Sequence, residues 1–165
     1  MSWLYIQMTI NNFIKILFSI LIGLYLDSRI NFYASDYYLN FTLGFLIFCF
    51  WSFSLPNNLY ALSSFFIGLI IDLILGSPFG LNALLLTISS YLIHSYRYSF
   101  KIFSFLQITI FFAFLSSFYL GFINLFMNTA NFSYLLIMLS FLLNGLTWIF
   151  IYLLMNKFKK RFYRQ

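Results

Sequence analysis

Six long apolar runs, separated by short polar breaks, make up almost the whole chain. They cover about residues 9–26, 38–54, 59–75, 78–96, 102–127 and 134–155. The runs lack the alternating polarity of a transmembrane β-strand. Because backbone groups that face lipid must bond within their own segment, each run predicts a membrane-spanning α-helix. At about 20 residues per crossing, six helices with short loops use nearly all of the chain.

The breaks between the runs contain turn-forming residues. Pro56-Asn57-Asn58 separates the second run from the third, and Gly76-Ser77-Pro78 separates the third from the fourth. We expect Gly76 to end one helix in the left-handed conformation, Ser77 to cap the next helix, and Pro78 to be its first residue. The third and fourth helices should then form a tight hairpin.

The composition supports an all-α integral membrane protein. Hydrophobic residues make up 63% of the chain and charged residues 7%, whereas a soluble domain has about 25% charged residues. There is too little polar surface to cover a globule in water. We therefore expect a single polytopic membrane domain over residues 1–165. Three tryptophans lie near run ends and are expected at the membrane interface, namely Trp3, Trp51 and Trp148.

The distribution of positive charge predicts the orientation in a bacterial cytoplasmic (inner) membrane. With the N-terminus inside, the cytoplasmic side receives Lys15, Arg97, Lys101 and the basic tail of residues 156–165. The outer side receives Asp27, Arg29 and Asp36. This is a strong positive-inside bias, so both termini are expected in the cytoplasm. The tail should anchor to anionic lipid rather than to nucleic acid, through Lys157, Lys159, Lys160, Arg161 and Arg164.

Asp72 is the acidic residue of greatest interest. It is one of three acidic side chains, and a charge at the centre of a membrane helix costs about 2.5–3.5 kcal/mol. Gly68, Asp72 and Gly76 are spaced four apart and share one helix face, where glycine permits close packing. Asp72 should therefore face protein. It either staples the hairpin by binding the start of the next helix, or forms part of a pocket or partner-binding notch with Asn82.

Signals for catalysis or for a cofactor are weak. His94 is the single histidine, and the sequence has no metal-ligand spacing, no nucleophile with a suitable base and no glycine-rich phosphate loop. We therefore expect neither an enzyme nor a cofactor. The segment from Gly23 to Asp27 is similar to the one from Gly68 to Asp72, but five positions in such an apolar chain match easily, so we attribute this match to chance.

The residues around Asp72 resemble the signature of the bacterial rod shape-determining MreD family. That family is similar in a Trp…Pro segment followed by Gly-Leu-x-x-Asp and Gly-x-x-x-Gly-x-x-Ala-Leu. The matching stretches here are Trp51-Ser52-Phe53-Ser54-Leu55-Pro56, Gly68-Leu69-Ile70-Ile71-Asp72 and Gly76-Ser77-Pro78-Phe79-Gly80-Leu81-Asn82-Ala83-Leu84. Gln107 after the Arg97–Lys101 loop and Trp148 before the basic tail also fit.

The resemblance implies a non-enzymatic scaffold of the elongation machinery that builds the lateral cell wall. The implied partners are a bitopic MreC-type protein, an MreB-type filament, and a RodA-type polymerase with its transpeptidase. The face around Gly68, Asp72, Gly76 and Gly80 is then the candidate helix-contact surface. The family also resembles in fold the substrate-binding subunits of vitamin transporters. The alternative is therefore a transporter subunit, whose pocket would use Asp72, Asn82, Asn124 and Asn144.

Overall fold

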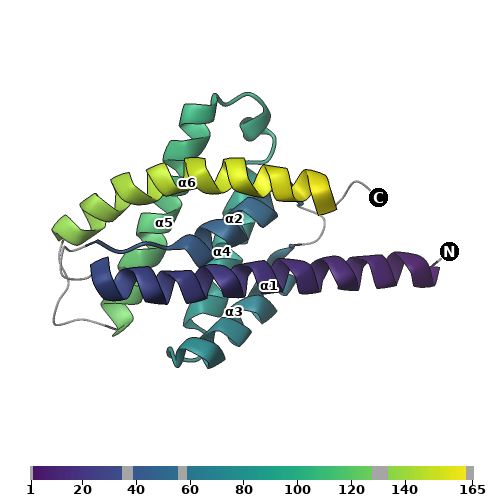
Figure 1. Cartoon of the computed structure of the whole chain (residues 1–165), viewed down its shortest axis with the longest axis horizontal. Helices are drawn as coiled ribbons and strands as arrows, with labels where there is room; N and C mark the ends of the chain where they lie inside the picture. The colour runs from purple at the N-terminus through teal and green to yellow at the C-terminus, as the bar shows by residue number, and fades with distance from the viewer. Residues whose placement is uncertain (1, 35–38, 56–58, 128–133, 163–165) are drawn as a thin grey trace.

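The computed structural model describes residues 2–34, 39–55, 59–127 and 134–162, and this part of the chain is all-helical. The elements are α1 (Ser2–Ala34), α2 (Leu43–Ser54), α3 (Ala61–Leu75), α4 (Leu81–Ser95), the 3-10 helix η2 (Ser99–Lys101), α5 (Phe105–Met127) and α6 (Tyr134–Phe162). The prediction of an all-α protein is thus confirmed for the described residues (Figure 1).

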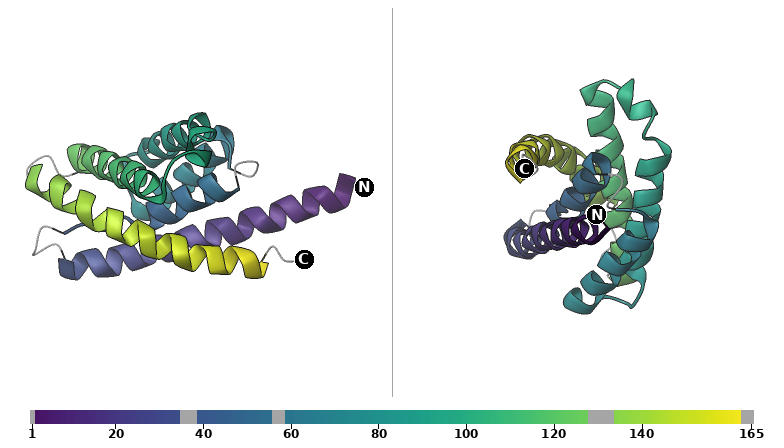
Figure 2. Two further views of the ribbon diagram at one scale, coloured as in Figure 1. Left: turned by 90° about the horizontal axis from the view of Figure 1, so that it is seen from above. Right: turned by 90° about the vertical axis from the view of Figure 1, so that its right-hand side faces the viewer.

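The helices pack as three consecutive pairs, α1 with α2, α3 with α4, and α5 with α6. Figure 2 shows α1 and α6 on one side of the molecule and α3, α4 and α5 on the other, with α2 between them. The short α2 is central: it contacts α1, α4, α5 and α6, and eight of its twelve residues are buried. The start of α1 and the end of α6 lie at the same end of the molecule (Figure 1).

Aromatic rings fill the core around α2, and two of the tryptophans expected at the interface belong to it. Trp148 is fully buried and stacks on Phe112 with ring centroids 3.8 Å apart. Trp51 is also buried, and its indole N–H donates to the Ser19 hydroxyl over 2.8 Å. The interface prediction is wrong for both rings. An internal stacking or hydrogen-bond partner removes the need for the membrane surface. The side chain of Trp3 lies outside the described residues.

Two helices are longer than the apolar runs that predicted them. Helix α1 extends past both ends of the run 9–26, so Asp27 and Arg29 are helical rather than part of a loop. Helix α6 continues from the run 134–155 to Phe162, so the first part of the predicted tail is helical. Asparagine, lysine and arginine end an apolar pattern without ending a hydrogen-bonded helix, which explains both differences.

Three other helices start three or more residues later than expected. Helix α2 begins at Leu43 instead of residue 38, and α4 begins at Leu81 instead of Pro78. Helix α5 begins at Phe105 instead of residue 102, after the 3-10 turn of η2. For α2 and α4 the late start has a polar cause. Side chains from other helices bind the backbone just before or at the helix start, as described below.

Among the described residues, α5 and the Ile137–Lys159 part of α6 are long and apolar enough to cross a membrane. Helices α2, α3 and α4 have 12, 15 and 15 residues, fewer than the roughly 20 of a full crossing. The six crossings therefore stay a prediction.

Candidate functional site

The carboxylate of Asp72 lies at the start of α4 and is 1% exposed. One oxygen accepts from the Ser77 hydroxyl at 2.7 Å and from the Asn82 side-chain and backbone N–H groups at 2.8 and 3.0 Å. The other accepts from the backbone N–H of Gly80 at 2.9 Å and of Ala83 at 3.4 Å. These N–H groups have no carbonyl partner within their helix, and an anion binds well there. This is the contact that the stapling interpretation expects.

The Asp72 cap also explains how the hairpin turns. Gly76 ends α3 in the left-handed conformation, with φ 64° and ψ 25°, as predicted. The predicted roles of Ser77 and Pro78 are wrong, because Gly80, with φ 93°, is the residue before the first turn of α4. Ser77 instead binds Asp72 through its hydroxyl, while exposed Pro78 lies in the turn. The Asp72 carboxylate from α3 caps α4 in place of a local residue.

Gly68 lets α3 and α4 approach closely enough for this contact. A Cβ atom at Gly68 would lie 2.2 Å from the Ala83 Cα, so only glycine fits without a shift of backbone. The helix face that carries Gly68 and Asp72 is therefore covered by α4 of the same chain. Gly76 and Gly80 have open space around them, and their positive φ angles account for glycine there.

Asn82 connects the hairpin to the rest of the core. Its side-chain N–H group donates to Asp72 and Ser77, and its oxygen accepts from the Tyr119 hydroxyl of α5 over 2.6 Å. The Tyr119 ring stacks on Phe45 of α2 with centroids 4.2 Å apart. One buried polar chain thus joins α3, α4 and α5, and ends against α2.

A second glycine–aspartate unit, at Gly23 and Asp27, repeats this arrangement between α1 and α2. The Asp27 carboxylate accepts from the backbone N–H of Leu43 at 2.6 Å and of Gly44 at 2.8 Å. A Cβ atom at Gly23 would lie 2.8 Å from the Gly44 Cα. The match attributed to chance in the sequence therefore corresponds to a shared structural role, and that interpretation was wrong. The signal was the Gly-x-x-x-Asp spacing, which occurs in α1 and α3, the two helices whose aspartate binds the start of the next helix.

Two asparagines hold the non-helical backbone just before α2. The side chain of Asn31 in α1 bonds both the N–H and the carbonyl of Phe41, over 2.7 and 2.9 Å. Asn144 in α6 accepts from the Thr42 N–H over 3.2 Å and donates to the Asn40 carbonyl over 3.3 Å. Buried backbone outside a helix requires such partners. Asn31 could not be singled out from the sequence, because its partner Phe41 lies ten residues further along the chain and only the fold brings the two together.

A polar cavity of about 300 Å³ lies beside these residues, between α1, the segment before α2, and α5. Asp27, Asn31, Tyr119 and Asn124 line it, but Asp72, Asn82 and Asn144 do not. Asp72 and Asn82 bind each other, but the four residues expected to form a transporter pocket do not share a cavity. Asp27, Asn31 and Tyr119 are already bonded within the protein.

An apolar groove of about 420 Å³ runs between α1 and α6, with α2 as its floor. Its lining residues are Lys15, Phe18, Ser19, Ile22, Ile47, Trp51, Met155 and Phe158. Phe18, Ile22 and Phe158 are 64%, 45% and 48% exposed, so the groove is open at its rim. Trp51 is the one predicted contact residue that lines this groove. Pro56 lies outside the described residues.

The predicted membrane anchor is described only in part. Lys157 is exposed on α6, and the Lys159 ammonium donates to the Ser54 carbonyl at the end of α2 over 3.1 Å. Lys159 thus contacts the last turn of the central helix. Arg164 and the side chains of Lys160 and Arg161 lie outside the described residues.

Comparison with known proteins decides the family. The family model described as rod shape-determining protein MreD matches residues 7–158. The chain belongs to the MreD family. It is also 31% identical over 119 residues to the rod shape-determining protein MreD of Haemophilus influenzae, covering 70% of this chain and 73% of that protein. No solved structure matches the chain.

MreD membership confirms the resemblance seen in the residues around Asp72 and supports a role in rod shape determination. The MreD family is one of shape-determining proteins rather than a known family of enzymes. Together with the apolar helices α5 and α6, membership fits an inner-membrane protein. The comparisons give no support to the transporter alternative.

Proposed function

We propose that this protein is a non-enzymatic membrane scaffold of the cell-wall elongation machinery, and that its α1–α6 groove holds the single transmembrane helix of an MreC-type partner. The observation that carries the proposal is the open apolar groove lined by three helices. This moves the candidate contact surface from the Gly68–Asp72 face, which α4 covers, to the groove that contains Trp51.

The chemistry of the groove suits a helix. Association of helices in lipid depends on close packing and on small residues that let backbones approach. Ser19 supplies a small residue beside Trp51, and its hydroxyl already accepts from the indole N–H. Phe18 and Phe158 extend from the rim, where they can pack on either side of an inserted helix.

The polar contacts described above keep the floor of the groove in place. Asp27 binds the start of α2 and Lys159 binds its last carbonyl, so both ends of this helix are held by side chains of α1 and α6. These are the same two helices that form the groove walls. Asp27 and Lys159 are therefore positioning residues, which set the width of the groove without touching the partner.

We further propose six crossings with both termini in the cytoplasm. One end of the molecule collects the cations: Lys15 lines the groove near Phe158, and Arg97 and Lys101 share a cavity with Ser52 near the end of α2. Asp27 and Asp72 bind the starts of α2 and α4, at the other end of those helices. The end of the molecule that carries these cations would face the MreB-type filament. The lipid-exposed helices would face the RodA-type polymerase and its transpeptidase.

Filling the groove tests the proposal. Ile22→Trp places a large ring on the groove wall, and Ile110→Trp places the same ring on α5 outside it; the two isoleucines are 45% and 51% exposed. With equal membrane levels, Ile22→Trp should give rounded cells and lose the bitopic partner on purification, while Ile110→Trp keeps rod shape and partner. Rod-shaped cells with a retained partner in Ile22→Trp would contradict the proposed seat.

A further inference from the structure

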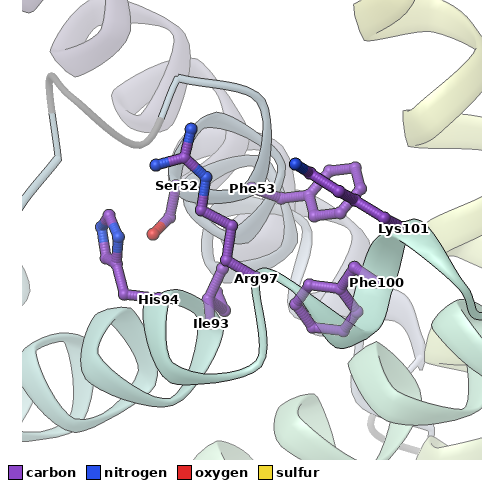
Figure 3. Close-up of a pocket in the computed structure, with 7 residues that line it drawn as sticks. All are labelled: Ser52, Phe53, Ile93, His94, Arg97, Phe100 and Lys101. Carbon is purple, nitrogen blue, oxygen red and sulfur yellow. The ribbon is translucent and has the colours of Figure 1, made fainter.

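A second cavity, of about 190 Å³, lies where α2 and α4 end. Its lining includes Ser52 and Phe53 of α2, His94 of α4, and Arg97, Phe100 and Lys101 from the segment that follows α4 (Figure 3). The cavity shares no residue with the groove or with the contacts of Asp72. Two of these side chains, Arg97 and Lys101, are cationic, and none of the lining residues is acidic.

Ser52 supplies a buried hydroxyl that has no partner in the described part of the chain. The residue is 0% exposed, and its oxygen makes no hydrogen bond. Buried Ser89 and Ser117 donate to the carbonyl one turn earlier in their own helix, whereas Ser52, like Ser140, does not. In Figure 3 the Ser52 oxygen points into the space between His94 and Arg97. A buried hydroxyl without a partner is unfavourable, so a ligand that accepts a hydrogen bond from Ser52 would stabilise this position.

The two cations at the cavity lack a protein counter-charge among the described residues. Arg97 and Lys101 are exposed, and the Lys101 ammonium lies 5.5 Å from the centroid of the Tyr98 ring. The carboxylates of Asp27 and Asp72 are engaged at the starts of α2 and α4, a helix length away. Arg97 extends over the cavity toward Ser52 (Figure 3). The site therefore combines positive charge with a neutral donor.

We propose that this cavity binds the phosphate of an anionic phospholipid. The Arg97 guanidinium can donate two parallel hydrogen bonds to phosphate oxygens, with Lys101 as a second cation and Ser52 as a third donor. Phe53 and Phe100 form apolar walls beside the glycerol and first acyl carbons. Basic pockets between membrane helices on the cytoplasmic side suit such head groups, and the choice of leaflet rests on the orientation proposed above.

His94 positions the cavity wall rather than the phosphate. Its Nε2 lies 2.9 Å from the Leu59 carbonyl oxygen, and its ring stacks on Tyr60 with centroids 5.3 Å apart. Nε2 must carry the proton to donate to that carbonyl. The Nε2–H group is therefore engaged by the Leu59 carbonyl and is not available to a phosphate oxygen.

Purified protein in detergent tests the site. Short-chain phosphatidylglycerol should raise the melting temperature, whereas short-chain phosphatidylcholine, with its added cation, should not. Arg97→Gln should weaken phosphatidylglycerol binding at least about tenfold, the effect of losing roughly one charged hydrogen bond. Ser52→Ala should weaken it less. Arg29→Gln is the matched control, since Arg29 is an exposed arginine beside Tyr25 on α1, and it should bind as the unchanged protein does.

Three results would overturn the proposal: undiminished lipid binding in Arg97→Gln, an equal effect of phosphatidylcholine, or an equal shift with inorganic phosphate alone. The last result would assign the cavity to free phosphate. If Arg97→Gln melts early without lipid, Lys101→Gln gives the same test at an exposed position. Arg97→Gln should still co-purify with the bitopic partner, and Ile22→Trp should still bind lipid, so either proposal can fail alone.

Discussion

The α1–α2 and α3–α4 pairs contain the same glycine–aspartate unit, but they differ in how many contacts from outside the pair hold the connection between the helices. In α3–α4, residues 76–80 connect the helices, and Asp72 binds Ser77, Gly80, Asn82 and Ala83 in that connection and the first turn of α4. In α1–α2 the connection spans residues 35–42, and among the described residues Asp27 binds Leu43 and Gly44 alone.

The longer connection depends on another helix. Asn31 and Asn144 bond the backbone of residues 40–42, and Asn144 comes from α6, far along the chain. A short hairpin is thus self-contained, whereas the start of α2 depends on α6. The groove is lined by α1, α2 and α6. Its shape therefore depends on the polar contacts that α1 and α6 make at the start of α2.

The largest expected effect comes from removing the self-contained cap. Asp72→Ala should destabilise the protein by about 3 kcal/mol, because buried backbone donors lose a charged acceptor. Asp27→Ala should cost about 1–2 kcal/mol, the usual loss for a helix cap, since Asp27 is only half-buried. Unfolding in mixed micelles measures both, and Asp72→Ala should also lose more of its shape function. Equal stability, membrane levels and function in the two variants would refute the contrast.

A smaller effect tests the dependence on α6. Asn144→Leu removes both contacts with residues 40 and 42 and should cost about 1–2 kcal/mol. Hydrogen exchange of the Thr42 and Leu43 amides should rise, while that of Asn82 stays unchanged. Asn124→Leu is the control, because Asn124 lines the nearby cavity and has no hydrogen bond with the described residues. If Asn144→Leu leaves the Thr42 amide protected, residues 40–42 have another support.

Much of the fold could be predicted from the sequence because hydropathy and turn residues are local signals. They located the helices, the left-handed Gly76 and an inward-facing Asp72. Helix ends were less accurate, since Asp27 and Asp72 bind the starts of helices that begin well after them in the chain. A local search for a helix cap selects Ser77. In the structure the Asp72 carboxylate caps α4, and the Ser77 hydroxyl donates to that carboxylate.

The groove could not be predicted, because it depends on how α1 and α6 are placed around α2 and not on any one segment. Trp51 was selected through its place in the family motif, yet an amphipathic ring suits both the interface and the core, and only the Ser19 contact decides between them. Asn144 was selected as a pocket residue because it is polar in an apolar helix. Its backbone partners at residues 40 and 42 are set by tertiary packing.

The most direct test of the central claim is photo-cross-linking in living cells from a reactive residue at position 18 or position 114. Phe18 lies on the groove rim and Phe114 on α5, and their side chains are 64% and 65% exposed. The account predicts a covalent adduct with the MreC-type bitopic partner from position 18 and none from position 114. An adduct with that partner from position 114 alone would contradict it.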